Sequence, residues 1–167
     1  MRALSLNQPL ASFCVWLQTL DPGTGQGVAE KEYETRSFGC SWARKIKPET
    51  IYIHATGFSK RMRELRDKNP EIFLNTLRAH GYEDPRDLPT GGIVGLVNVL
   101  GSLPTETIRD RLSLRELAFG IYDTGRIAIR LARPVPFTEI FLCKGRLGLW
   151  TVPEELHLTI EKSRRPK

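Results

Sequence analysis

The segment Gly92-Ile-Val-Gly-Leu-Val-Asn-Val-Leu100 decides the fold class, because it is the most apolar run in the chain. A short, continuous apolar run indicates a strand buried on both faces, at the centre of a sheet. Further strands are predicted at residues 3–6, 31–37, 51–55, 126–131, 135–142 and 147–152, and helices at 9–20, 59–68, 69–81, 105–111 and 113–119. About six short strands with inserted helices predict an α+β domain built on a small, partly closed barrel.

Length and charge narrow the class of protein further. The chain has 167 residues and carries 25 Lys and Arg against 19 Asp and Glu, a formal net charge of +6. We expect one domain over residues 1–160 and a flexible basic tail at 161–167, which has no apolar anchor. No run approaches the ~20 apolar residues of a membrane span, so no membrane contact is expected. The basic excess makes a polyanion the first candidate partner.

The cysteines and histidines are few and scattered. The three cysteines, Cys14, Cys40 and Cys143, are far apart and form no C-x-x-C pair. Neither a disulfide framework nor a zinc site has this spacing. We therefore expect a cytoplasmic protein with no metal and no cofactor.

The strand predicted at Lys31-Glu-Tyr-Glu-Thr-Arg-Ser37 is unusual because it is polar on both faces. Strict alternation places Glu32, Glu34 and Arg36 on one face and Lys31, Tyr33 and Thr35 on the other. Burying Glu34 and Arg36 without partners costs several kcal/mol. They are expected either to pair in the interior or to line a cleft, and the spacing favours neither.

Six short motifs occur in a fixed order along almost the whole chain. They are Gln8-Pro9-x-Ala11, Lys31-x-x-Glu34-x-Arg36, Ile53-His54-Ala55, Gly92-Ile-Val-Gly95-Leu-Val97, Gly120-x-Tyr122-x-x-Gly125-Arg126 and Gly145-x-x-Gly148-Leu-Trp150. The ordered set resembles the ASCH family of the PUA-like superfamily. The resemblance implies a PUA-like β-barrel flanked by helices, with a cleft lined by the Lys/Glu/Arg strand. It also implies a protein that binds RNA or a modified nucleotide, DNA being a further possibility.

The resemblance leaves an enzymatic alternative, a hydrolase of RNA or of a modified nucleoside. One group of these proteins hydrolyses N4-acetylcytidine with a lysine, a threonine three residues later and a distant glutamate. Lys31 matches that lysine, but the position three residues on is Glu34, and Thr35 follows it. If the chain is an enzyme, it is expected to be a ribonuclease or a nucleoside amidohydrolase. Its candidate catalytic residues are then Lys31, Glu34 and Thr35.

The candidate residues for binding a nucleotide combine cations, a carboxylate and aromatic rings. Lys and Arg attract phosphate, a carboxylate accepts from a base amine, and an aromatic ring stacks on a base. The set is Gln8, Lys31, Glu34, Arg36, Ser37, Trp42, His54, Tyr122 and Arg126. Trp42 is followed by Arg44, Lys45 and Lys47, and a basic loop with an aromatic residue is typical of nucleic-acid binding.

Structural roles compete with these assignments. Lys31 is equally consistent with an exposed lysine that protects a strand edge. His54 fits a packing residue, and Tyr122 and Arg126 fit a turn around Gly125. The basic run Arg61, Arg63, Arg66 and Lys68 alternates with Glu64 and Asp67, which favours a solvated helix face. The oligomeric state is left open.

Overall fold

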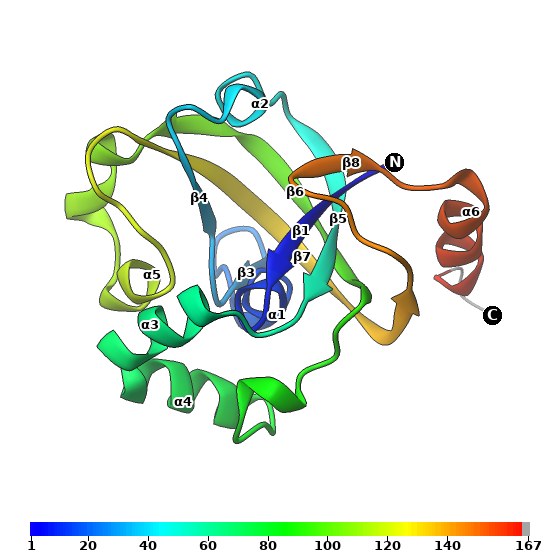
Figure 1. Ribbon diagram of the computed structural model, residues 1–167, viewed down its shortest axis with the longest axis horizontal. Helices are drawn as coiled ribbons and strands as arrows, with labels where there is room; N and C mark the ends of the chain where they lie inside the picture. The colour runs from blue at the N-terminus through cyan, green and yellow to red at the C-terminus, as the bar shows by residue number, and fades with distance from the viewer. Residues whose placement is uncertain (165–167) are drawn as a thin grey trace.

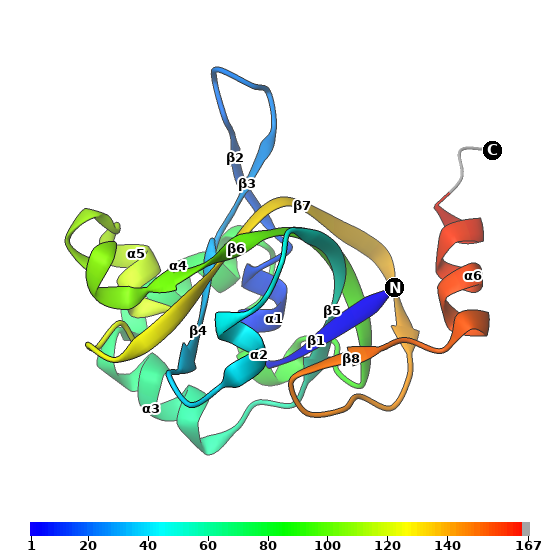
Figure 2. The ribbon, with the colours of Figure 1, turned by 90° about the horizontal axis from the view of Figure 1, so that it is seen from above.

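The computed structural model of the protein describes residues 1–164, and its centre is a six-stranded mixed sheet that curls into a half-barrel (Figures 1 and 2). The strand order is β4-β7-β6-β5-β1-β8, so β4 and β8 are the two edges. β1 and β5 pair in parallel, and every other neighbouring pair is antiparallel. The strands are β1 (Arg2–Asn7), β4 (Tyr33–Ser37), β5 (Glu49–Thr56), β6 (Gly92–Pro104), β7 (Arg126–Leu142) and β8 (Leu149–Thr151). The predicted α+β fold class is confirmed.

The apolar segment 92–100 does form a central strand, β6, which pairs with β5 on one side and β7 on the other. The predicted strands 126–131 and 135–142 are one continuous strand, β7, which passes through Arg133 at a positive φ of 51°. The pairing register of β6 and β7 shifts at three places. Such irregularities bend a sheet, and here they allow it to curl.

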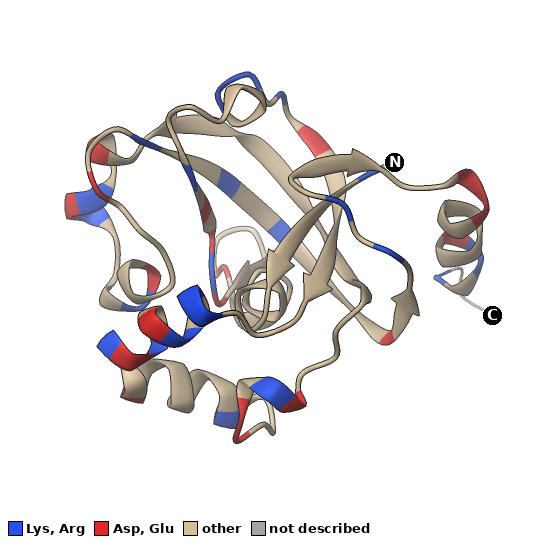
Figure 3. Cartoon of the chain, viewed as in Figure 1, with Lys and Arg blue, Asp and Glu red and all other residues tan. Residues whose placement is uncertain are grey.

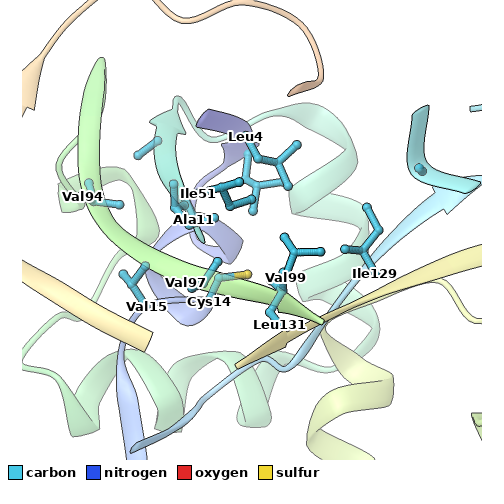
Figure 4. Packing of buried hydrophobic residues seen from close by; sticks show 14 of the residues in the cluster. Leu4, Ala11, Cys14, Val15, Ile51, Val94, Val97, Val99, Ile129 and Leu131 are labelled. Carbon is cyan, nitrogen blue, oxygen red and sulfur yellow. The ribbon is translucent and has the colours of Figure 1, made fainter. Parts of the chain in front are cut away.

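The interior of the half-barrel is filled by aliphatic side chains from the sheet and by a short helix. Leu4, Ile51, Val97 and Ile129 are among the buried residues of this cluster (Figure 4). Helix α1 (Leu10–Phe13) lies within the curl of the sheet, and all four of its residues are buried (Figure 1). Burial of this continuous apolar surface is the main force that holds the sheet in its curved form.

The helix predicted over residues 9–20 is wrong beyond residue 13. The backbone N–H groups of Val15 and Trp16 both bond to Ser12 O, which turns the chain. Residues Leu17–Leu20 then form β2 and pair with β3, Gly27–Ala29. Leu17 and Leu20, expected in a buried stripe, are 41% and 64% exposed. A hairpin forms here in place of the expected helix, because cross-strand pairing satisfies the backbone N–H and C=O groups of this segment.

Helices α3 (Lys60–Lys68), α4 (Pro70–Ala79) and α5 (Leu114–Ala118) pack together at one end of the half-barrel (Figure 1). Helix α2 (Ser41–Arg44) lies apart from them in Figure 1 and follows β4 in the chain. Short 3-10 turns occur at Pro85–Asp87, Thr105–Thr107 and Arg109–Arg111. A second buried cluster, which includes Phe13, Met62, Phe73, Leu77 and Phe119, packs α3, α4 and α5 against α1. Ser59 caps α3 by accepting from the N–H of Met62, as its sequence predicts.

Helix α6 (Glu154–Ser163) packs on the outer surface of the sheet through Ile160, far from α3 (Figure 1). Residues 161–163 of the tail expected at 161–167 instead complete this helix, and Tyr52 Oη donates to Glu161 Oε1 at 3.1 Å. Residues 165–167 of that tail lie outside the described part of the chain. Within residues 1–164, no helix is both long enough and apolar enough to cross a membrane.

Candidate functional site

A cleft of about 700 Å³ lies where the half-barrel is open. Strand β8 pairs only with residues Arg2–Leu4 of β1, so Ser5, Leu6 and Asn7 continue beyond it toward the open side. Edge strand β4 faces these residues across the opening, and α3 covers it. We call this opening between β4 and β1 the seam of the half-barrel.

Cations dominate the charged residues that line the cleft. They are Arg36, Lys60, Arg61, Lys68 and Arg126, against the two acids Glu34 and Glu64. The basic residues of α3 and β4 are visible on the same side of the molecule in Figure 3. Since a cleft lined by one sign of charge concentrates counter-ions, this one attracts anions.

Arg36 has the least satisfied side chain of the cleft. Its Nη2 lies 3.2 Å from Glu34 Oε1, so the expected pair exists as an ion pair. Its Nε and Nη2 are nevertheless buried and have no hydrogen-bond partner among residues 1–164. The guanidinium also lies 5.8 Å from the centre of the Trp42 ring. Buried donors are normally hydrogen-bonded, and a guanidinium suits phosphate or carboxylate oxygens.

Arg126 contributes a second guanidinium to the cleft. Its Nε donates to Ile121 O at 3.0 Å, which fixes the side chain after the turn at Gly125. Burial lowers the pKa of Arg126, and the nearby charges of Arg61 and Arg36 lower it further. Crowded like charges repel one another, and an anion bound between them relieves that repulsion.

Lys31 lies outside the cleft lining and is completely buried. Strand β4 begins only at Tyr33, and Lys31 N bonds to Phe13 O at 2.9 Å, so the strict alternation assumed from sequence breaks here. Lys31 Nζ donates to Tyr33 O and lies 3.5 Å from Glu116 Oε1. The alternative of an exposed edge lysine is therefore wrong, and Lys31 joins α5 to the start of β4.

Glu116 of α5 is a buried acid that the sequence did not identify. Its carboxylate accepts the backbone N–H groups of Glu32 at 2.7 Å and Tyr33 at 3.2 Å, and the hydroxyl of Tyr122. Burial and the adjacent Glu116 raise the pKa of Tyr122. Ser113-x-x-Glu116 is a recognisable helix start, but no local pattern indicates that this carboxylate binds a distant strand.

Three other predicted residues are packed in the interior rather than in the cleft. Gln8 Nε2 donates to Pro89 O at 2.7 Å, and Gln8 Oε1 accepts from Ser12 N. His54 has Nε2 3.1 Å from Cys143 O and meets Trp150 edge-on. Tyr122 is bound to Glu116, as described above. The contacts of His54 and Tyr122 agree with the structural roles considered for them, whereas no structural role was considered for Gln8.

The cleft does contain Glu34, Thr35, Arg36, Ser37 and Arg126 from the predicted set. Thr35 Oγ1 accepts the N–H of Ile121 at 3.2 Å. Trp42 contacts Arg36 but lines a different hollow. The charges of α3 are largely exposed, as a solvated face requires, and Arg61 and Lys68 among them also line the cleft; Lys60, which lines it as well, was not considered. The alternation of basic and acidic residues along α3 could not show which side of this helix faces the seam.

The curled six-stranded sheet with flanking helices defines an α+β protein built on a half-barrel. Among solved structures, the chain is similar to ASCH from Zymomonas mobilis, at 15% identity and a TM-score of 0.49, over 96% of this chain and 93% of that one. A point mutant of the same protein matches at 14% identity and a TM-score of 0.48, over 96% of both chains. No family model matches the sequence, and neither does any curated protein. The chemistry of the site comes from the residues described above.

Proposed function

We propose that this protein binds single-stranded RNA or a modified nucleotide in the cleft between β4, β1 and α3. The observation that carries the proposal is Arg36, whose buried Nε lacks a hydrogen-bond partner among the described residues and whose Nη2 has only the ion pair with Glu34, in a cleft with four further cations. The cleft volume of about 700 Å³ falls within the ~300–1,000 Å³ of small-ligand sites. That size suits one nucleotide of a strand rather than a duplex.

The lining offers separate surfaces for the parts of a nucleotide. Arg36 and Arg126 present guanidinium groups for phosphate oxygens, with Lys60 and Arg61 nearby on α3. Leu65 and Ile121, which line the cleft and are half-buried, supply apolar surface for the flat face of a base. The hydroxyl groups of Thr35 and Ser37 are able to bond a ribose or a base edge.

Binding is tested with a fluorescein-labelled hexacytidylate RNA by fluorescence anisotropy. The variant Lys60→Gln/Arg61→Gln changes two exposed positions on α3, and we expect it to weaken binding by about tenfold. It should also lower the slope of log affinity against log salt by about 1.4, which is the value for two phosphate contacts on a single strand. Arg109→Gln/Lys162→Gln removes the same charge outside the cleft and should change affinity less than twofold. Equal affinity of the wild type and the cleft variant would contradict the proposal.

The identity of the polymer is part of the same proposal. A deoxycytidylate hexamer of equal length reports whether the 2′-hydroxyl contributes, because it is the group that distinguishes RNA from DNA. Tighter binding of the ribose form supports RNA as the partner. A cytoplasmic location, expected from the cysteine pattern, belongs to this proposal as well.

A nucleoside hydrolase is the second candidate, and the buried Lys31–Glu116 pair is the observation that bears on it. A lysine beside a carboxylate is able to exchange a proton, but here both groups are buried and Lys31 is not part of the cleft lining. The test is incubation of the wild type with N4-acetylcytidine and with RNA, followed by chromatography of the products. Turnover that is lost in Thr35→Val would support the enzyme, and no turnover on either compound would refute it.

A further inference from the structure

A second hollow, of about 270 Å³, lies at the opposite end of the seam from the cleft. It is lined by Arg2 of β1, Leu149 of β8, and Trp42, Lys45, Ile46 and Lys47 of α2 and the loop after it. The proposed function assigns no role to this hollow. It contains the basic loop with an aromatic residue that the sequence singles out.

Trp42 connects the two hollows. Its indole lines the second hollow, and the guanidinium of Arg36, which lines the cleft, lies 5.8 Å from its ring centre. On the β8 side, Gly148 adopts a φ of +71°, and a Cβ there would lie 3.2 Å from Trp42 Nε1. A glycine therefore allows the loop before β8 to approach the indole edge closely. Trp42 fills the middle of the seam and leaves one hollow on each side.

The lining of the second hollow has two kinds of surface. The indole of Trp42, Ile46 and Leu149 form a half-buried apolar floor. Arg2 is paired with Glu49, whereas Lys45 and Lys47 are exposed and have no acidic partner within residues 1–164. An aromatic and aliphatic floor beside free lysines is the combination by which proteins hold successive nucleotides of a single strand.

We propose that this second hollow binds the base of a neighbouring nucleotide of the strand whose first nucleotide occupies the cleft. Lys45 and Lys47 hold the phosphates that flank this base, and Trp42 provides its stacking surface. The inference rests on the proposed function and adds the ligand class: a single strand of at least two nucleotides, laid along the seam past Trp42.

The proposal is tested by comparing a ligand that reaches one hollow with a ligand that reaches both. Cytidine 5′-monophosphate is titrated by calorimetry and labelled hexacytidylate RNA by anisotropy, against wild type, Lys45→Glu/Lys47→Glu and Trp42→Leu. We expect Lys45→Glu/Lys47→Glu to weaken hexamer binding by about tenfold and to change monophosphate binding less than twofold. Arg109→Glu/Lys162→Glu carries the same charge change away from both hollows and serves as the control.

Trp42→Leu should weaken hexamer binding by at least fivefold while the monophosphate still binds, because stacking contributes ~1–3 kcal/mol per base. Monophosphate binding also shows that this variant is folded; if the variant unfolds, Lys45→Glu/Lys47→Glu decides alone. Equal affinity of wild type and that double variant for the hexamer, with the monophosphate still bound, would overturn the second subsite and leave the proposed function intact. If Lys45→Glu/Lys47→Glu weakened the binding of both ligands equally, the lysines would act only through their long-range electrostatic field. That result would also overturn the second subsite. If the wild type bound neither ligand, both proposals would fail.

Discussion

Replacing Lys31 with methionine should destabilise the protein strongly and leave the cleft able to bind. The side chain is completely buried, with Nζ between Tyr33 O and the carboxylate of Glu116. Lys31→Met keeps the aliphatic length but leaves Glu116 as a buried charge without its cation. Removing one partner of a buried ion pair costs ~3–5 kcal/mol.

The lower end of that range applies here. Glu116 keeps three hydrogen bonds, from Glu32 N, Tyr33 N and Tyr122 Oη, which stabilise its negative charge without the lysine. We therefore expect a loss of about 3 kcal/mol in the free energy of unfolding. At ~2–4 °C per kcal/mol for a chain of this size, the melting temperature should fall by about 6–12 °C.

Urea denaturation followed by circular dichroism measures the loss, and a double-mutant cycle shows where it arises. Lys31→Met/Glu116→Gln should cost less than the two single changes together, because the double variant holds no unpaired charge. Lys47→Met, at an exposed position, is the matched control and should stay within ~0.5 kcal/mol of wild type.

Two results would refute this reasoning. A loss below 1 kcal/mol in Lys31→Met would mean that the ammonium is hydrated rather than enclosed. A folded Lys31→Met that no longer binds RNA would mean that Nζ reaches the ligand. The sequence favoured that second outcome, since it placed Lys31 in the cleft.

Three further predictions concern stability measured by urea denaturation. Gly95→Ala should lower the free energy of unfolding by ~1–3 kcal/mol, because the added Cβ would lie 2.6 Å from the backbone oxygen of Val135. Gly39→Ala is the control, since a Cβ there meets open space and should not change stability. Equal stabilities of the two variants would contradict the close approach of β6 and β7. Ser113→Ala should cost ~1 kcal/mol, since Ser113 Oγ accepts the Glu116 N–H at 3.1 Å; no loss would show that the cap contributes nothing. Burial raises the pKa of the Tyr122 hydroxyl from its ordinary 10.0, so this tyrosine ionises first in the unfolded chain and lowers stability above pH 10 by ~1.4 kcal/mol per pH unit. Tyr122→Phe should reduce the alkaline slope by that amount and leave the contributions of Tyr52 and Cys14, whose pKa values burial also raises; an unchanged slope would contradict the assignment.

Much of the fold was predictable because it follows from local patterns. The apolar run 92–100 indicated the central strand, and Ser59 and Pro70 indicated the starts of α3 and α4. The helix expected at 9–20 was wrong because its apolar spacing is also compatible with a short helix followed by a hairpin. Only the pairing of Leu17–Leu20 with Gly27–Ala29 distinguishes the two, and the spacing of apolar residues does not show this cross-strand pairing.

The site was predictable in part. The ordered motifs directed attention to the strand containing Glu34 and Arg36, and both residues line the cleft. The contributions of Lys60 and Arg61 could not be predicted, because the orientation of α3 depends on how Met62 packs against the apolar cluster around Phe13. Glu116 was missed for a similar reason, since its partners lie more than 80 residues away in sequence.

The sequence by itself determined the class of the protein: a basic α+β protein with a central apolar strand and an unusual polar strand before Ser37. Composition and periodicity suffice for this because they set which surfaces must be buried. Only the tertiary structure decided the roles of the charges. It enclosed Lys31 against Glu116, left Arg36 Nε without a hydrogen-bond partner among residues 1–164, and placed Trp42 beside both the cleft and the second hollow. The physical reason is that the environment of a charge depends on groups that the fold brings together from distant parts of the chain.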